Sequence, residues 1–199
     1  NKDGAGNLVV KPYAVGEQAP VDGLPSADAV RRYGYTFQGW ATDPVNPLAI
    51  VYNPGDTITM AGETITLYAM WLPVPYIVSY DTTHQGDPIA ADIIDKAGVV
   101  WEDTNLLPSP DPSTDGYIYG GWFYDVDNDG KYNPDVDFLV TDSMSFGDIV
   151  ETYAAKAGRA VDDSISGITL HVWWKPVTVR ITYVAVGNGG LTVYYEDVN

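Results

Sequence analysis

The part of the sequence best suited to chemistry is an aspartate-rich stretch at residues 125–137, DVDNDGKYNPDVD. Its first three aspartates, Asp125, Asp127 and Asp129, alternate along the chain and are followed by Gly130. Ca²⁺ takes six to eight hard oxygen ligands, and a chain that curls around the ion brings alternate carboxylates together. The sequence therefore predicts a structural Ca²⁺ site in this loop.

The second half of the same loop supplies the remaining predicted ligands. The glycine permits a sharp turn, after which the carbonyl of Lys131 is expected to point inward, and Asn133 stands at the ninth loop position. The twelfth position, which carries a bidentate glutamate in an EF-hand, is Val136, and either of its neighbours Asp135 and Asp137 would close the shell. The predicted ligands are Asp125, Asp127, Asp129, Lys131, Asn133, Asp135 and Asp137.

A metal-free loop is the competing interpretation. Asp and Asn side chains commonly cap their own turns in solvated loops, and they need no ion to do so. The flanking segments are typical of strands rather than of paired helices, so neither an EF-hand nor a dockerin is expected. Five aspartates within this short stretch nevertheless repel one another unless a cation offsets their charge. Both interpretations stay open at the level of sequence.

Catalysis finds little support in the residue inventory. The chain has no cysteine, which excludes thiolate metal sites, disulfides and cysteine nucleophiles. His84 lies in a predicted turn without an evident base or metal partner, and His171 is expected to pack on a strand. Neither a nucleophile elbow nor a phosphate-binding glycine loop is present. We therefore expect a protein without enzyme activity.

The charge balance excludes further classes of function. Asp and Glu number 27 against 10 Lys and Arg, which gives a formal net charge of −17. Such a surface repels the phosphate backbone of nucleic acids and anionic membrane surfaces. No apolar run is long enough to span a bilayer. We expect no nucleic-acid partner and no membrane insertion of this segment.

Sequence landmarks occur twice in the same order. GYTFQGW at 34–40 is matched by GYIYGGW at 116–122, and TLYAMW at 66–71 is matched by TLHVWW at 169–174. The offset grows from 82 to 103 residues between these landmarks, so the second copy carries an insertion of 21 residues. Self-similarity in a fixed order indicates a modular array.

The repeat divides the chain into three parts. We expect a first module at residues 1–72 and a second module at 73–176, with the insertion at about 141–165. Residues 177–199 then begin a third repeat or form a C-terminal pair of strands. Proline-containing linkers follow the last strand of each module and stiffen the connection.

These landmarks resemble the Listeria–Bacteroides repeat, the B-repeat of internalin-type surface proteins, which has a G-Y-x-F-x-G-W core and a closing L-Y-A-x-W strand. The resemblance covers roughly residues 8–72 and 74–175. It implies small ubiquitin-like, β-grasp-like sheets. It also implies an extracellular place on a bacterial surface, with the anchor in regions outside this chain.

The predicted fold class is β-rich α+β. Runs of alternating β-branched and aromatic residues predict strands at 33–41, 64–71, 76–81, 167–174 and 177–186. One helix is predicted inside the insertion, with Ser145 and Asp148 at its start and Gly158 at its end. Its apolar face is formed by Phe146, Ile149, Val150, Tyr153 and Ala157. Residues 87–98 fit either a helix or a strand.

The expected function is that of a non-catalytic stalk or adhesion module in a monomeric rod. Its partner would be a protein or glycan on a host or neighbouring cell. The alternative is a carbohydrate-binding module, because Trp101, Trp173 and the tyrosines at 194–195 lie outside the repeat frame and could stack on sugars. Trp40, Trp71, Trp122 and Trp174 recur at the landmarks and are expected in the core.

Overall fold

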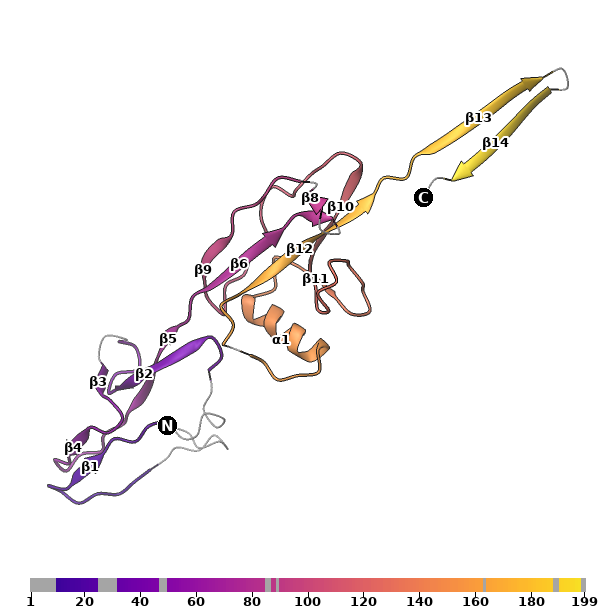
Figure 1. Cartoon of the computed structure of the whole chain (residues 1–199). Coiled ribbons are helices and arrows are strands. Elements are labelled where there is room, and N and C mark those ends of the chain that lie inside the picture. The colour runs from indigo at the N-terminus through magenta and orange to yellow at the C-terminus, as the bar shows by residue number, and fades with distance from the viewer. Residues whose placement is uncertain are drawn as a thin grey trace.

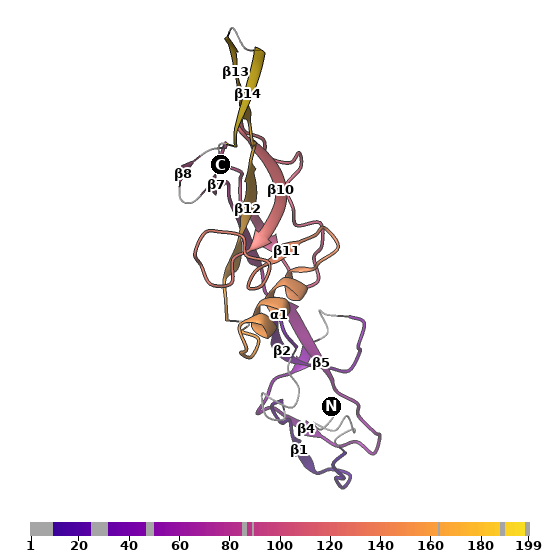
Figure 2. The same ribbon diagram turned by 90° about the vertical axis from the view of Figure 1, so that its right-hand side faces the viewer.

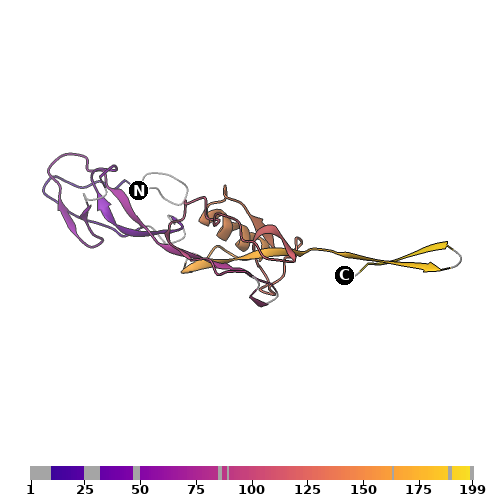
Figure 3. The same cartoon turned by 90° about the horizontal axis from the view of Figure 1, so that it is seen from above.

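The molecule is elongated, and its parts follow one another along the chain (Figures 1, 2 and 3). The computed structural model describes residues 10–24, 32–46, 50–84, 87–88, 90–162, 164–187 and 190–197. A small β-sheet region lies at one end, a five-stranded sheet with one helix lies in the middle, and a two-stranded hairpin extends from the other end. The described part of the chain is therefore β-rich with one helix, in agreement with the predicted class.

The second module is built on a mixed five-stranded sheet with the order β11-β10-β12-β6-β9. Its central strands β6 and β12 run parallel, and the other neighbours are antiparallel. The strands are β6 (Tyr76–Asp81), β9 (Lys96–Val99), β10 (Tyr117–Tyr124), β11 (Phe138–Val140) and β12 (Gly167–Pro176). A short hairpin of β7 (Thr83–His84) and β8 (Asp87–Pro88) follows β6. Residues 87–98 thus contain β8 and most of β9 rather than a helix.

The predicted helix is present as α1 (Phe146–Lys156) and covers one face of this sheet (Figure 1). Ser145 and Asp148 form a capping box, in which each side chain hydrogen-bonds the backbone N–H of the other residue. Gly158 follows the helix with a φ of 64°, which suits a C-terminal stop. The predicted apolar face is confirmed in Phe146, Ile149 and Val150, which are buried. Two positions differ: Tyr153 is half-buried, and Ala157 is exposed.

Aromatic side chains fill the core between α1 and the sheet. Tyr76 on β6 stacks on Phe146 with the ring centroids 4.3 Å apart, and Trp122 on β10 is fully buried. Trp174 is also buried, and its indole N–H donates to the carbonyl of Thr82 at 3.0 Å. The recurrent tryptophans therefore serve the core, as predicted, except that Trp71 in the first module is half-buried.

The first module has less regular structure. Its main sheet has the order β3-β2-β5, and a separate antiparallel pair is formed by β1 and β4. The strands are β1 (Gln18–Pro20), β2 (Tyr35–Ala41), β3 (Ile50–Tyr52), β4 (Thr57–Thr59) and β5 (Tyr68–Pro73). The strand predicted from residue 64 begins only at Tyr68, because within the described ranges no second strand lies along residues 64–67.

The repeated motif is explained by backbone geometry. Gly34 and Gly116, which open the motif, have φ values of 75° and 81°, a left-handed region that glycine enters at little cost. Gly39 and Gly121 lie at φ values of 143° and 124°, where β2 and β10 each shift register against their neighbours. The same two glycine requirements therefore recur in both modules.

The linker after each module is held in the same way. The amide of Val74 donates to the carbonyl of Gly34 at 2.8 Å, and the amide of Val177 donates to the carbonyl of Gly116 at 2.9 Å. These bonds tie the first linker residue back to the opening glycine of the motif. The chain therefore leaves both modules along the same path.

The C-terminal strands β13 (Arg180–Gly187) and β14 (Gly190–Asp197) form an antiparallel hairpin that extends from the second module (Figure 1). A strand pair was one of the two expectations for this segment, and the backbone forms one. The alternative reading as the start of a third repeat is compatible with the same hairpin. Among the described helices, none has the length and apolar character needed to cross a membrane.

Candidate metal-binding loop

The aspartate-rich stretch connects two paired strands of the second module. Strand β10 ends at Tyr124 and β11 begins at Phe138, and these two residues are directly opposite each other in the antiparallel register. Asp125 and Asp137 are the next residues into the loop from either side, so the strand pairing holds its two ends together. The sheet thereby brings the first and last aspartates of the stretch into one place.

Asp125 organises the first half of the loop. Its side chain is 8% exposed, and its Oδ1 accepts hydrogen bonds from the amides of Asn128 at 2.7 Å and Asp129 at 3.3 Å. Its Oδ2 accepts from the amide of Gly130 at 2.7 Å. One carboxylate thus satisfies three successive backbone donors and curls the chain around itself. The turn uses positive φ values of 59° at Asn128 and 75° at Gly130.

Asp137 connects the two halves of the loop through hydrogen bonds to the backbone of each half. It is 1% exposed, its Oδ1 accepts from the amide of Val126 at 2.9 Å, and its Oδ2 accepts from the amide of Asn133 at 2.8 Å. Burial of a carboxylate is costly unless hydrogen bonds compensate it. The backbone donors provide that compensation and fix the carboxylate near Asp125.

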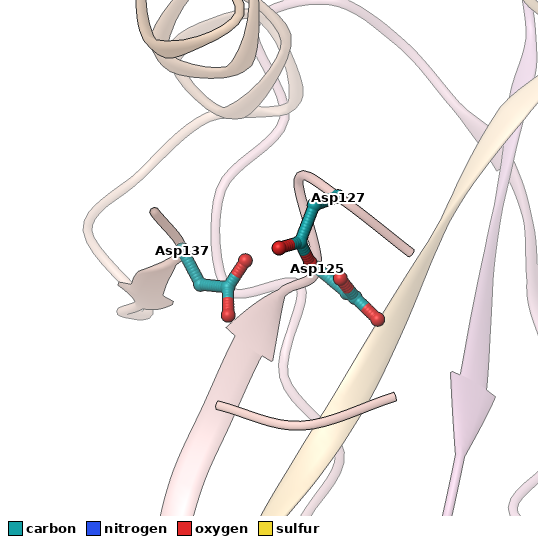
Figure 4. A group of neighbouring side chains, drawn as sticks. All are labelled: Asp125, Asp127 and Asp137. Carbon is teal, nitrogen blue, oxygen red and sulfur yellow. The ribbon is translucent and has the colours of Figure 1, made fainter. Parts of the chain in front are cut away.

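Three carboxylates converge in this loop (Figure 4). Asp125, Asp127 and Asp137 each offer one oxygen, and these oxygens all lie within 4.8 Å of one another. Asp127 is exposed, and its pKa is raised by desolvation and by the neighbouring carboxylates, Asp129 foremost among them. Desolvation and nearby like charges both disfavour the charged form of Asp127, which is why its pKa is raised.

The other predicted ligands have mostly local roles. One oxygen of Asp129 accepts from the amide of Lys131 at 2.8 Å, and the side-chain oxygen of Asn133 accepts from the amide of Asp135 at 3.1 Å. Of the described acidic residues, the converging group includes neither Asp129 nor Asp135. The loop therefore combines both interpretations from the sequence: side chains that cap turns, and a group of carboxylates.

The donor set fits a hard cation. Carboxylate oxygens are the ligands that Ca²⁺ prefers, and the group contains no nitrogen or sulfur donor that would favour zinc or copper. Three carboxylates are fewer than the ligands that Ca²⁺ requires, so water or backbone carbonyls would complete the shell. Asp125, Asp127 and Asp137 are the residues that would hold the ion.

The sequence prediction put Asp125, Asp127 and Asp129 first and left Asp135 and Asp137 as alternatives for closing the shell. It missed that Asp125 and Asp137 organise the backbone of the loop. The signal available for this was their position: they are the first and last residues of the stretch and directly adjoin two predicted strands. Residues at such a point are held together by the strand pairing itself.

The two histidines serve packing and pairing. Nδ1 of His171 lies 3.0 Å from Oδ2 of Asp81 on the parallel neighbour strand. Burial works to raise the pKa of Asp81, but hydrogen bonds from Thr83 and the contact with His171 outweigh it and lower that pKa. His84 packs against Tyr117 with the ring centroids 5.0 Å apart.

The two tryptophans singled out for sugar binding differ in exposure. Trp101 is 8% exposed and belongs to the core, so its assignment to an exposed platform was wrong. Trp173 is half-buried, with Tyr132 at a centroid distance of 4.4 Å and the Lys175 ammonium 3.9 Å from its ring centre. The tyrosine side chains at 194–195 lie outside the described residues.

Similarity to known proteins agrees with the duplicated motif. A model of the Listeria-Bacteroides repeat domain matches residues 1–70 and again residues 76–146. A protein of Evansella cellulosilytica that carries the name "Gly-rich membrane protein" is 32% identical over 102 residues, which cover 51% of this chain and 11% of that protein. No solved structure matches the chain. The repeat is typical of bacterial surface proteins. With two matches that together span more than half of its length, the chain belongs to the Listeria-Bacteroides repeat domain family.

Proposed function

We propose that this chain is a non-catalytic, extracellular repeat region of a bacterial surface protein, and that it acts as a stalk and adhesion module. The observation that carries the proposal is the junction between the two modules. Trp101 of the second module lies directly against Gly34 of the first, where an added Cβ would come within 2.7 Å of the Trp101 ring. A linker alone would leave the modules free to move, whereas this contact joins them.

Further contacts support a stiff junction. Tyr33 stacks on Trp101 with the ring centroids 5.7 Å apart, and the Tyr35 hydroxyl donates to Glu102 at 2.7 Å. The linker itself contains Pro73 and Pro75, which restrict its backbone. Packing, a hydrogen bond and a restricted linker all act at the junction. Together they would limit the motion of one module relative to the other, as a stalk requires.

The module itself supports a β-grasp-like fold. In chain order the second module places its first strand, β6, parallel to its last, β12, at the centre of the sheet. Antiparallel strands flank this pair on both sides, and a helix covers one face. This arrangement is typical of a β-grasp. The helix enters between β11 and β12, in keeping with an insertion.

The stalk proposal is tested by small-angle scattering of the full chain and of Trp101→Ala. We expect an extended particle for the parent and a broader distribution of intramolecular distances for the variant, because the variant loses the contact with Gly34. Trp173→Ala is the matched control, since Trp173 lies away from the junction, and it should scatter like the parent. A parent chain whose distribution of intramolecular distances is as broad as that of Trp101→Ala would contradict the stalk proposal.

We further propose that the loop at 125–137 binds Ca²⁺ as a structural ion. The convergence of Asp125, Asp127 and Asp137 supports it, because bringing the three charges together costs free energy that a cation would offset. An ion bound only by the folded loop raises the melting temperature in proportion to the logarithm of its concentration. The ion would then stabilise the β10–β11 hairpin against which α1 packs.

The calcium proposal is tested by calorimetric titration and by melting with and without Ca²⁺. Asp127→Asn is the informative variant, because Asp127 is exposed and its loss spares the backbone bonds made by Asp125 and Asp137. We expect Asp127→Asn to lose the calcium-dependent rise in melting temperature and Asp135→Asn, outside the converging group, to keep it. A parent protein that does not respond to millimolar Ca²⁺ would refute the site.

The alternative function is carbohydrate binding. The half-buried pair of Trp173 and Tyr132 supports it, because partly exposed aromatic rings can stack on sugars. A glycan array with the parent chain and Trp173→Ala separates the two functions. Specific glycan binding that is lost in Trp173→Ala favours the alternative, and an array without binding favours the stalk.

A further inference from the structure

The chain enters and leaves the second module through two neighbouring strands. It comes from the first module through Pro75 and begins β6 at Tyr76, and it leaves toward the C-terminal hairpin at Pro176, the end of β12. Strands β6 and β12 are direct neighbours in the sheet and run parallel. The points of entry and exit therefore lie at opposite ends of one strand pair, which runs along the length of the molecule (Figure 1).

The direction of pull decides how such a strand pair separates. When two parallel strands are pulled from opposite ends, the force runs along the strands and acts on every hydrogen bond between them at once. The bonds of a parallel ladder are evenly spaced, so they share this force and must break together. When the strands are pulled from the same end, the bonds open one after another. Tension between the first module and the C-terminal hairpin acts on β6 and β12 in the first way.

The contact between β6 and β12 is continuous and is closed at both ends. The register runs without a shift from Ile77 opposite Gly167 to Asp81 opposite His171. At the first pair, the amide of Ile77 donates to the carbonyl of Ser166 at 3.1 Å. At the last pair, Nδ1 of His171 lies 3.0 Å from Oδ2 of Asp81. Backbone and side-chain contacts thus bridge the two strands from one end of the ladder to the other.

A buried tryptophan extends the contact beyond the ladder. Trp174 on β12 donates its indole N–H to the carbonyl of Thr82, the residue that follows β6, at 3.0 Å. Val78 on β6 and Leu170 on β12 are both 0% exposed on the core face of the same pair. Hydrogen bonds beside such a core are electrostatically stronger than bonds in water. The core therefore supports the contact over its whole length.

Gly167 brings the two backbones close together at the start of the ladder. A Cβ at this position would lie 2.2 Å from the carbonyl oxygen of Ile77. Glycine inside a strand often marks such a close approach of another backbone. The first pair of the ladder thus depends on a residue without a side chain.

We infer that β6 and β12 form a shear clamp, through which the second module carries tension along the molecule without unfolding. Resistance to force is set by the barrier to unfolding rather than by the free energy of unfolding, so a module with a small core can possess it. Each strand must also leave a second neighbour, β9 for β6 and β10 for β12, before it can be pulled out. The inference rests on the proposed stalk, because a stalk is the part of a surface protein that is placed under tension.

Single-molecule pulling of the full chain between two introduced cysteines tests the inference. The chain has no cysteine of its own, so each pair of cysteines defines the points of attachment. Pro75→Cys with Thr178→Cys pulls β6 and β12 from opposite ends, whereas Pro75→Cys with Ser166→Cys pulls them from the same end. All three positions are exposed, so the substitutions leave the core unchanged. We expect the first pair of cysteines to unfold the second module at several times the force needed with the second pair. Equal forces would overturn the inference.

Two tryptophan variants test the part that the indole hydrogen bond plays in the clamp. Trp174 and Trp122 are both buried, but the indole N–H of Trp122 has no hydrogen-bond partner among the described residues. Trp122→Phe is therefore a matched control for Trp174→Phe, since both remove the same atoms from the core. With the strands pulled from opposite ends, Trp174→Phe should lower the unfolding force by more than Trp122→Phe. A loss in Trp122→Phe that equals or exceeds it would overturn the assignment of this bond to the clamp.

The pulling experiment is independent of the junction between the modules, because the force acts only between residues 75 and 178. Equal forces in a chain that scatters as a stiff rod would overturn the clamp and leave the stalk proposal standing. Unequal forces in a chain that scatters like Trp101→Ala would support the clamp and contradict the stalk. The two proposals can therefore fail separately.

Discussion

The two modules share a motif and differ in what covers it. In the second module, β6 and α1 enclose Trp122, which is fully buried, and the surrounding core includes Tyr76, Phe146 and Leu170. In the first module, Trp40 is buried next to a groove of about 620 Å³. The motif thus specifies a strand that needs glycine at two positions with positive φ values. Completion of the core depends on what is added to that strand, since one short repeat has little apolar surface to bury.

The loops that follow the motif extend this comparison. Asp43 lies two residues after the end of β2, and its Oδ1 accepts a hydrogen bond from the amide of Val45 at 2.9 Å. Asp125 falls at the matching motif position and accepts from three amides. An aspartate that caps one turn in the first module thus organises a longer loop in the second. The candidate metal site is an elaboration of a capping residue that both modules use.

The largest expected difference between the modules lies in two isoleucines. Ile149 on α1 is fully buried, whereas Ile65 in the groove is 37% exposed. Ile149→Ala should lower the free energy of unfolding by about 4 kcal/mol, since it leaves a cavity in a packed core. Ile65→Ala should lower it by about 1 kcal/mol. Chemical denaturation followed by tryptophan fluorescence measures both. Equal losses would contradict the comparison.

The second difference isolates the junction between the modules. Gly34 and Gly116 have similar positive φ values, so alanine at either position costs about 1–2 kcal/mol of backbone strain. Only at Gly34 does the added Cβ meet the Trp101 side chain, and at Gly116 it meets nothing. We expect Gly34→Ala to cost about 2 kcal/mol more than Gly116→Ala, because of this overlap. Thermal unfolding of both variants gives the difference, and its absence would mean that the junction yields without cost.

Sequence patterns predicted what depends on local residues. The capping box at Ser145, the stop at Gly158 and the strand β6 all follow from side chains and glycines within a few positions. The order of landmarks also revealed the duplication, and the family match confirms it. These features are local because helix caps and turn glycines act on their own backbone.

Features that need a distant neighbour were missed. The strand predicted from residue 64 is shortened because a strand requires a partner, and its period-two pattern does not say whether one is present. Trp101 was a candidate for sugar stacking because it lies outside the repeat frame, yet contacts with Tyr76 and Phe146 in its own module and with Gly34 across the junction bury it. Likewise, strand pairing rather than spacing selected Asp137 over Asp129 for the carboxylate group.

A smaller effect is expected at the start of α1, an element that the described part of the first module lacks. Ser145→Ala removes the N-cap and should cost about 1 kcal/mol. Hydrogen bonds from the amide and hydroxyl of Ser145 lower the pKa of Asp148. The cap's contribution is therefore present above the ordinary pKa of an aspartate and is lost as pH falls through the lowered value. Thermal unfolding at neutral and strongly acidic pH should show the difference between parent and Ser145→Ala shrinking in acid.

The smallest effect is expected from the polar contact at the junction. Glu102 accepts from the Tyr35 hydroxyl at 2.7 Å and lies 3.8 Å from the Arg32 guanidinium. The Arg32 and Glu102 side chains are exposed, and exposed ion pairs contribute about 0–1 kcal/mol because water and salt screen them. We expect Glu102→Gln to change the free energy of unfolding by less than about 0.5 kcal/mol and Trp101→Ala to change it by several times more. A loss in Glu102→Gln that equals the loss in Trp101→Ala, measured by denaturation in low salt, would show that polar contacts rather than packing join the two modules.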